Sequence, residues 1–332
     1  MSVPRPGSVT IADVAREAGV STATVSNALN ATGRASEATR RRVREAAARL
    51  GYRPNPAGRA LRTGRAGAIG LAVTTYGAVA WDVASVSYYA QAIAAATSVA
   101  HQHGYALVLL PAGLDADGWW DVQVDGVVLM DSPEDDPAVA VLRERRIPVA
   151  FDGRPDQPHA RDSWVDNDHE QAIAMVLDHL AAQGATRVAL LAGDSSDAYT
   201  RACVAAYTAR VAQPRIGCIS HDDPEGRRAA RALLEGGADA VHGIFDGCGR
   251  GVLAAARELG LRVPDDVLVV TASEDPAYAW TAPPVTTLSL LPVEAATRAV
   301  TALVGAIETG EGTAEADLPV RLDVRASTQP LR

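Results

Sequence analysis

The chain has 332 residues, of which 48% are hydrophobic, enough for more than one domain and a large core. No stretch approaches the ~18 uninterrupted apolar residues of a membrane-spanning helix, and the N-terminus lacks the apolar segment of a secretion signal. Three scattered cysteines, Cys203, Cys218 and Cys248, favour reduced thiols over disulfides or a metal cluster. We therefore expect a cytoplasmic protein that does not contact membranes.

Charge is distributed unevenly along the chain. Residues 1–65 contain twelve arginines and four acidic residues, a net charge of +8; the whole chain carries −9, so the remainder carries −17. Basic segments attract the phosphates of nucleic acids, whereas acidic surfaces are repelled by them. The division predicts a small nucleic-acid-binding unit joined to a larger acidic body.

The first 60 residues carry the start and stop signals of helices. Thr10 is an expected N-cap, and Gly19 ends the helix that it begins. Ser21 and Ser36 are the expected caps of the next two helices. The pair Asn55-Pro56 predicts the start of a short fourth helix, because proline is favoured at the first helical position.

From Ala66 onward, apolar strand-like runs alternate with helical stretches. The runs cover 68–73, 106–110, 125–130, 147–151, 187–193, 241–245, 266–270 and 286–290. Nearly continuous apolar strands separated by helices are typical of parallel sheets that are covered on both faces. The length of this region favours two doubly wound lobes with a cleft between them.

The region around Gly19 is typical of a helix-turn-helix. Ala15 is small where two helices would cross, and Val25 would face inward from the second helix. That helix would place Thr22 and Ala23 against thymine methyl groups and Asn27 against adenine in the major groove. Hydroxyl groups and arginine would instead contact phosphates, and these residues are Thr10, Ser21, Ser26 and Arg34. The alternative interpretation is an ordinary helical hairpin.

The stretches "VTIADVAREAGVSTATVSNALN" and "TRRRVREAAARLGYRPNPAGRALRTGR" resemble the N-terminal region of LacI/GalR-family transcription regulators. Later stretches resemble further blocks of that family in the same order: "IPVAFDGR", "VDNDHEQAIAMVLDHLAAQGATRVALLAG", "FDGCGRGVLAAARELGLRVPDDVLVV" and "PPVTTLSLLP". The resemblance implies an α/β chain with a helix-turn-helix headpiece at 1–52, a hinge helix and linker at 53–65, and a two-lobed, periplasmic-binding-protein-like effector domain at 66–332.

The resemblance also implies a homodimer that binds palindromic operator DNA, most simply as a repressor. The hinge helix would insert Leu61 into the minor groove; the alternative is that Leu61 only forms the apolar face of a linker helix. The DNA-binding residues expected on these grounds are Thr10, Ser21, Thr22, Ala23, Thr24, Ser26, Asn27, Arg34, Asn55, Arg59 and Leu61.

The effector would bind in the cleft between the lobes, and a carbohydrate is the ligand suggested by analogy. Asp168, Arg201 and Asp246 match the family's motifs and suit a polyhydroxylated ligand. The chain departs from the family's motifs at Phe245 and at Ser273. The family has a ligand-binding acid at the position of Ser273, and Glu274 or Asp275 could replace it here. Aromatic residues near the cleft could stack on a ligand, although Tyr88 and Tyr89 could equally belong to the core. The expected effector-binding residues are Tyr76, Trp81, Tyr89, Asp168, Arg201, Phe245, Asp246 and Ser273.

Two other classes of protein are weighed against a regulator. A sugar-binding protein of the transport type would need a secretion signal and would not need the basic headpiece. An enzyme would need an acid–base pair or a phosphate-binding glycine loop, and no such motif occurs. We therefore expect neither catalytic residues nor a metal or cofactor.

Overall fold

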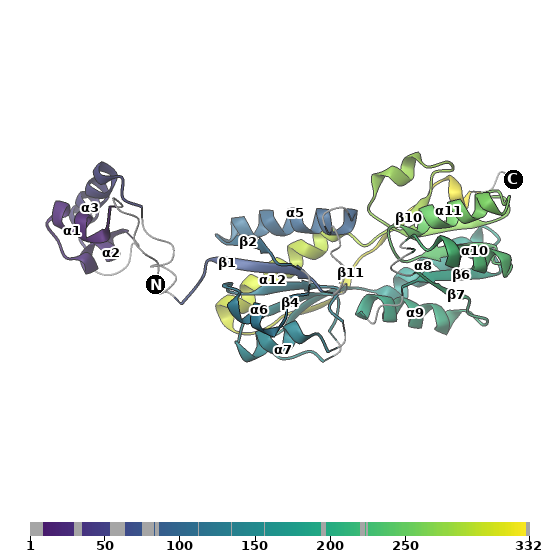
Figure 1. Ribbon diagram of the computed structural model, residues 1–332, viewed down its shortest axis with the longest axis horizontal. Coiled ribbons are helices and arrows are strands. Elements are labelled where there is room, and N and C mark those ends of the chain that lie inside the picture. Colours follow the sequence, from purple (N-terminus) through teal and green to yellow (C-terminus); the bar gives the residue numbers. More distant parts are fainter. Residues whose placement is uncertain are drawn as a thin grey trace. The chain divides into compact units, whose positions relative to one another are not determined.

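The computed structural model describes residues 9–29, 35–53, 64–74, 83, 86–111, 113–133, 135–155, 157–193, 197–219, 223 and 225–329. The chain divides into two compact units, Met1–Ala66 and Gly67–Arg332 (Figure 1). Most of the expected hinge segment, 53–65, lies outside the described residues, so its helix stays a prediction. No helix in the described part of the chain is long and apolar enough to cross a membrane.

Three helices make up the described part of the first unit: α1 (Ile11–Ala18), α2 (Thr22–Leu29) and α3 (Glu37–Leu50). Their starts confirm the predicted caps. The Asp13 carboxylate accepts the backbone N–H of Thr10 at 2.9 Å, and the Thr10 hydroxyl accepts the N–H of Asp13 at 3.4 Å. Ser21 and Ser36 each accept the N–H three residues on, at 3.1 Å and 3.2 Å. These bonds satisfy backbone donors that the helices leave unpaired.

Gly19 makes the turn between α1 and α2. Its φ of 63° lies in the left-handed region, which glycine adopts without the steric penalty of a Cβ atom. The turn directs α2 across α1, and small apolar side chains from all three helices fill the space between them. The buried core of this unit is Val14, Ala15, Ala18, Val25, Ala28, Val43, Ala46 and Ala47.

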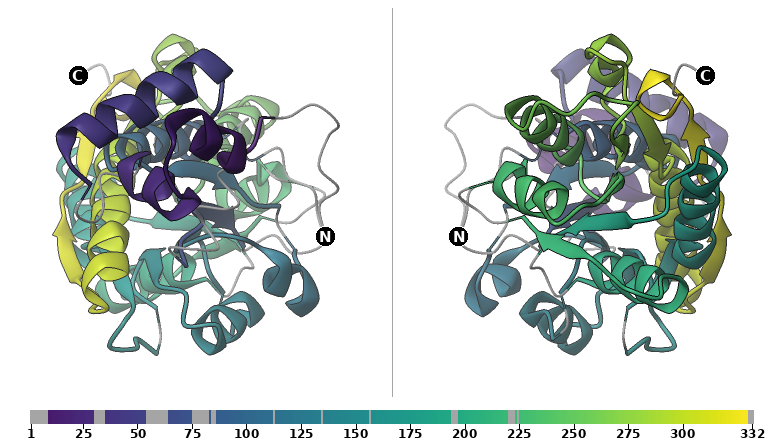
Figure 2. Two further views of the ribbon diagram at one scale, coloured as in Figure 1. Left: turned by 90° about the vertical axis from the view of Figure 1, so that its left-hand side faces the viewer. Right: turned by 90° about the vertical axis from the view of Figure 1, so that its right-hand side faces the viewer.

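The first sheet of the second unit has the strand order β11-β5-β4-β3-β1-β2, with every pair parallel. Its strands are β1 (Ala68–Val73), β2 (Ala106–Leu109), β3 (Val127–Met130), β4 (Val149–Asp152), β5 (Ser163–Asn167) and β11 (Ala314–Leu318). Helices lie on both sides of the sheet (Figures 1 and 2). One face packs on α5 (Ser87–Gln102) and α12 (Pro292–Thr309), and the other on α6 (Ala116–Asp121) and α7 (Pro137–Glu144).

The second sheet has the order β12-β10-β9-β8-β6-β7, and only its β10–β12 pair is antiparallel. Its strands are β6 (Val188–Ala192), β7 (Ile216–Cys218), β8 (Ala240–Gly243), β9 (Leu268–Ala272), β10 (Thr286–Ser289) and β12 (Arg321–Asp323). Four helices cover it, with α10 (Arg227–Glu235) and α11 (Cys248–Glu258) on one face and α8 (His169–Ala182) and α9 (Ala198–Arg210) on the other. Two short 3₁₀ helices, η2 (Pro276–Trp280) and η3 (Ala326–Thr328), complete this lobe. The expected two-lobed α/β architecture is confirmed.

Four strands were not predicted from the sequence: β5, β7, β11 and β12. Each lacks a continuous apolar run, because β5 alternates buried and half-buried residues and the other three lie at or next to sheet edges. Edge strands expose one side to water and need few apolar residues.

The chain passes between the two sheets after β5, after β10 and after β11. Asn167, at the end of β5, connects all three passages. Its amide Nδ2 lies 3.3 Å from the carbonyl oxygen of Leu290, 3.4 Å from that of Leu318 and 3.1 Å from that of Pro319. One buried amide therefore donates to backbone from each of the other two passages, where any relative movement of the lobes must be absorbed.

Candidate functional site

The outer face of α2 carries the side chains expected to read bases. Thr22, Ala23 and Asn27 are exposed, whereas Val25 and Ala28 on the opposite face are fully buried. Packing therefore fixes the orientation of the helix and presents two small side chains and one amide to solvent. Such a surface can enter the major groove without a steric clash.

The remaining predicted headpiece contacts fall into three groups. The Thr10 hydroxyl donates to Asp13 at 2.7 Å, and the Ser21 hydroxyl lies 2.9 Å from that of half-buried Thr24, so these groups already serve as helix caps. Ser26 is half-buried on α2. The predicted contacts at Arg34, Asn55, Arg59 and Leu61 lie outside the described residues.

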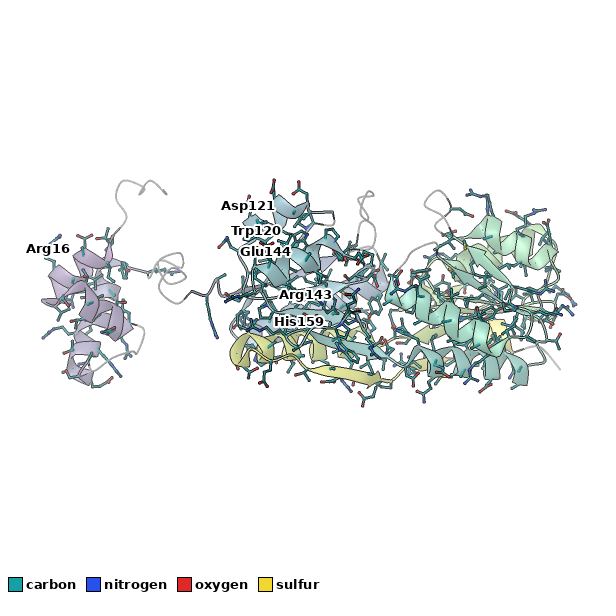
Figure 3. The ribbon with its side chains drawn as sticks, turned by 90° about the horizontal axis from the view of Figure 1, so that it is seen from below. Arg16, Trp120, Asp121, Arg143, Glu144 and His159 are labelled. Atoms are coloured by element: carbon teal, nitrogen blue, oxygen red, sulfur yellow. The ribbon has the colours of Figure 1, made fainter. Side chains whose placement is uncertain are left out.

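Exposed arginines surround this unit. The Arg16 side chain is 78% exposed and extends outward from α1 (Figure 3). Arg41, Arg42 and Arg44 are exposed on α3. Guanidinium groups at such positions can neutralise DNA phosphates, and the binding that results weakens as salt is raised.

A cavity of about 90 Å³ lies between the two lobes of the second unit, partly open to solvent. Residues at or just beyond the carboxyl ends of β3, β4, β5, β8 and β9 line it, as expected for doubly wound sheets. Its lining combines acidic and aromatic side chains, namely Tyr88, Tyr89, Asp131, Asp152, Asp166, His169, Tyr199, Phe245, Asp246 and Glu274.

Of the predicted effector-binding residues, Tyr89, Phe245, Asp246 and Ser273 line this cavity. Asp168 and Arg201 are not part of its lining, so their expected role in effector binding stays a prediction. Asp168 instead caps α8, and its carboxylate accepts the N–H of Gln171 at 2.8 Å. Arg201 lies within the first turns of α9. Tyr76 and Trp81 lie outside the described residues.

Two carboxylates that sequence reasoning missed lie on the first lobe's side of the cavity. The Tyr88 hydroxyl donates to Asp152 at 2.7 Å, and the Tyr89 hydroxyl donates to Asp131. Burial raises the pKa of Asp131 to about 7, and the negative charges of Asp197 and Asp152 act in the same direction. Burial likewise raises the pKa of Asp152 to about 6. Near neutral pH, negative charge at these two sites is therefore unfavourable in the empty cavity.

His169 and two aromatic rings lie on the second lobe's side. The His169 Nε2 atom is 3.0 Å from an oxygen of Asp166, and the histidine side chain is only 10% exposed. Its ring meets that of Tyr199 edge-on at 5.1 Å, and Tyr199 meets Phe245 edge-on at 6.0 Å. The His169 Nδ1 atom is buried and has no hydrogen-bond partner among the described residues.

Asp246 belongs to a charged network behind the cavity. It accepts a hydrogen bond from the Ser273 hydroxyl and lies 3.3 Å from the Arg250 guanidinium. Arg250 also pairs with Asp275 at 2.9 Å and with Glu225 at 3.3 Å. The Arg250 guanidinium thus pairs with three carboxylates, and the Asp275 carboxylate is one of them.

Glu274 connects the cavity to the second passage between the lobes. Its carboxylate accepts the Ser289 hydroxyl at 2.8 Å and the backbone N–H of Leu290 at 2.9 Å, and burial raises its pKa. Asn167, which contacts the other passages, lines the same cavity. A ligand here would touch residues that hold the passages together.

The sequence contained one signal for the missed acids. Asp131 directly follows the apolar run of β3, and Asp152 ends β4. Because the carboxyl ends of parallel strands gather at a sheet's ligand-binding edge, acids at those ends were candidates. Nothing comparable marked His169 or Tyr199, which come from helices.

The fold and site define a class of protein, a basic helix-turn-helix unit joined to a two-lobed body with a cavity between its lobes. Residues 10–55 match the bacterial regulatory proteins of the lacI family, and residues 177–328 match the periplasmic binding protein-like domain. The chain is 31% identical to the HTH-type transcriptional regulator CelR of Thermobifida fusca, with 94% of each chain covered. The chain belongs to the LacI family of bacterial transcription regulators.

Other relatives agree with this membership. Catabolite control protein A of Streptococcus mutans is 29% identical, with 85% of this chain and 86% of that protein covered. The solved lac repressor dimer, bound to operator and the anti-inducer ONPF, superimposes with a TM-score of 0.78 at 26% identity, covering 98% of this chain and all of that one. The CelR–cellobiose complex gives 0.71 at 27% identity, covering 96% and 99%.

Proposed function

We propose that the protein is a cytoplasmic, effector-controlled repressor that binds a palindromic operator as a homodimer and has no enzymatic role. The observation that carries the proposal is the exposed surface of α2, where Thr22, Ala23 and Asn27 stand opposite a buried face. One such helix reads few bases, and a good bidentate contact contributes only about 1–3 kcal/mol. Two copies on two half-sites would supply the missing specificity, as in the relative solved as a dimer on operator.

The interlobe cavity is the proposed effector site. By analogy with the CelR–cellobiose complex, a carbohydrate is one candidate ligand. Ligand contacts with Asn167 and Glu274 would alter the passages between the lobes and thereby the operator affinity. Such coupling is reciprocal, so operator DNA must change ligand affinity by the same factor.

A gel-shift titration with DNA from upstream of the protein's own gene tests the proposal. We expect specific binding that weakens with salt, and a loss of about 5- to 150-fold per half-site for Asn27→Ala. Gln102→Ala, which truncates an exposed amide on α5, is the matched control and should bind as the parent does. Equal binding to unrelated DNA, or undiminished binding by Asn27→Ala, would contradict the assignment.

A further inference from the structure

The lining of the interlobe cavity is strongly acidic. Five carboxylates contribute to it, and no arginine does among the described residues: Asp131, Asp152, Asp166, Asp246 and Glu274. The chain contains no lysine, and residues 75–82, 84–85 and 194–196, which the structure does not describe, contain no arginine. The imidazole of His169 is the one basic side chain in the described lining. The lining therefore holds more acidic than basic side chains.

The hydrogen-bonding groups of the lining also favour a ligand that donates hydrogen bonds. The side-chain donors of the lining already donate to protein acceptors: Tyr88 to Asp152, Tyr89 to Asp131, Ser273 to Asp246, Tyr199 to the Ile244 carbonyl, and Asn167 to three backbone carbonyls. The carboxylates keep further lone pairs, because each can accept about four hydrogen bonds. The side chains thus offer a ligand mainly acceptors.

His169 supplies an independent indication. When its Nε2 proton bonds Asp166, the Nδ1 atom of the neutral ring is a lone-pair acceptor. That atom is buried on a cavity-lining side chain and has no partner among the described residues. Buried polar atoms are rarely left without a partner, so in the neutral ring this nitrogen is an acceptor that the described residues leave unsatisfied.

Aromatic rings complete the environment. Tyr88 and Tyr89 meet edge-on at 5.6 Å, and Tyr199 and Phe245 contribute two more rings to the lining. The negative faces of aromatic rings attract organic cations. Among the described residues, no group of three acidic, histidine or cysteine side chains is arranged to hold a metal ion. The aromatic lining therefore suits an organic cation.

We propose that the effector inserts a protonated amine into this cavity, so that the regulator responds to an amine-bearing small molecule. This inference rests on the proposed effector role of the cavity. A neutral sugar needs donors for its own oxygen acceptors, and the side chains here have few to give. An adjoining pocket, which is also lined by Arg143 and Arg154, shares Asp131, Asp152 and Tyr199 with the cavity and offers space for the remainder of the ligand.

Matched pairs of compounds test the proposal on the full chain. Putrescine is compared with butanediol and glucosamine with glucose, at equal concentration and ionic strength, by thermal unfolding and calorimetry. We expect each amine to stabilise the protein more than its neutral partner. Putrescine affinity should also rise from about pH 5.5 to 8, as Asp131 and Asp152 ionise while the ligand stays protonated. Around Asp131 the charged or titratable neighbours are Tyr89, Asp197 and Asp152; around Asp152 they are Tyr88, Asp166 and His169.

Substitution identifies the site of binding. Asp152→Asn should weaken amine binding by about 10- to 100-fold, as expected for a charge-assisted hydrogen bond. Asp131→Asn provides a second variant should the first fail to fold. Asp178→Asn removes an exposed carboxylate on α8 and should change nothing.

Three results would overturn the proposal: neutral partners that bind as well as the amines, amines that stabilise no better than sodium chloride, or undiminished amine binding by both cavity variants. DNA affinity measured in the same samples separates this inference from the effector role. Amine binding that leaves DNA affinity unchanged would refute the coupling and keep the preference for amines.

Discussion

Replacing Asp131 by asparagine should make the ligand-free protein more stable, although the residue lies in the proposed binding site. The asparagine side chain has nearly the same shape, and its oxygen can still accept the Tyr89 hydroxyl. What the substitution removes is a carboxylate whose ionisation is unfavourable in the fold. Functional sites commonly hold such destabilising groups for the sake of a ligand.

The magnitude follows from the pKa of Asp131, which is raised from 3.8 to about 7. Each pKa unit corresponds to about 1.4 kcal/mol, so the largest gain in folding stability from Asp131→Asn is about 4 kcal/mol above pH 7. Because the residue is half-buried and its charge is coupled to those of Asp152 and Asp197, we expect about half of this value.

The sign is set by the raised pKa. Below the unfolded pKa the carboxyl group is protonated in both states and has no effect. As pH rises toward 7 the unfolded chain loses its proton first, so the parent protein loses stability. The advantage of Asp131→Asn should therefore be full near pH 8 and about a third of that near pH 5.

Thermal unfolding of the parent and variant at both pH values measures the effect. An advantage of about 2 kcal/mol corresponds to a rise in Tm of about 4 °C for a unit of this size. The exposed Asp178→Asn is the control and should not change Tm. A variant that is less stable than the parent near pH 8, or whose advantage grows toward acid pH, would refute the reasoning.

Three further substitutions test other parts of the structure. Burial lowers the pKa of His242 to about 4, so the unfolded chain takes up a proton before the folded one as pH falls. Between about pH 6.5 and 4 the parent should therefore lose about 3 kcal/mol more stability than His242→Leu. Urea titrations across that range measure the difference. Gly19→Ala should destabilise the headpiece by about 1 kcal/mol or more, because alanine is strained at a φ of 63°. Circular dichroism of isolated residues 1–66, a separate compact unit, should show a lower Tm for this variant. Gly64→Ala is the control, because Gly64 also has a positive φ but lies outside the helices, and it should leave the Tm of the helices unchanged. Asn167→Leu should lower stability by about 1–3 kcal/mol by leaving carbonyls of the lobe passages without their donor; an unchanged Tm would show that those bonds are not needed.

Much of the fold was predictable because its signals are local. The hydroxyl caps at Thr10, Ser21 and Ser36, together with Gly19, define the headpiece helices through bonds that span only a few residues. The central strands were predicted because burial on both faces requires continuous apolar runs. The edge strand β7 has only three residues, and its sequence did not identify it.

The cavity was only partly predictable because its lining depends on side-chain direction. Asp166, Asn167 and His169 line the cavity, whereas Asp168 between them turns back to cap α8. A sequence motif identifies this segment but does not decide which of four adjacent polar residues faces the ligand. Arg201 also matches a motif, on α9, and a motif on a helix does not establish that the side chain lines the cavity.

The central claim is that the outer face of α2 reads DNA on two symmetric half-sites. In-vitro selection from random duplex DNA with the full chain, repeated with Asn27→Ala, tests it across all possible half-sites. We expect a palindromic consensus for the parent and relaxed preference at one symmetric pair of positions for the variant. An asymmetric consensus, no enrichment, or an identical consensus for both proteins would contradict it.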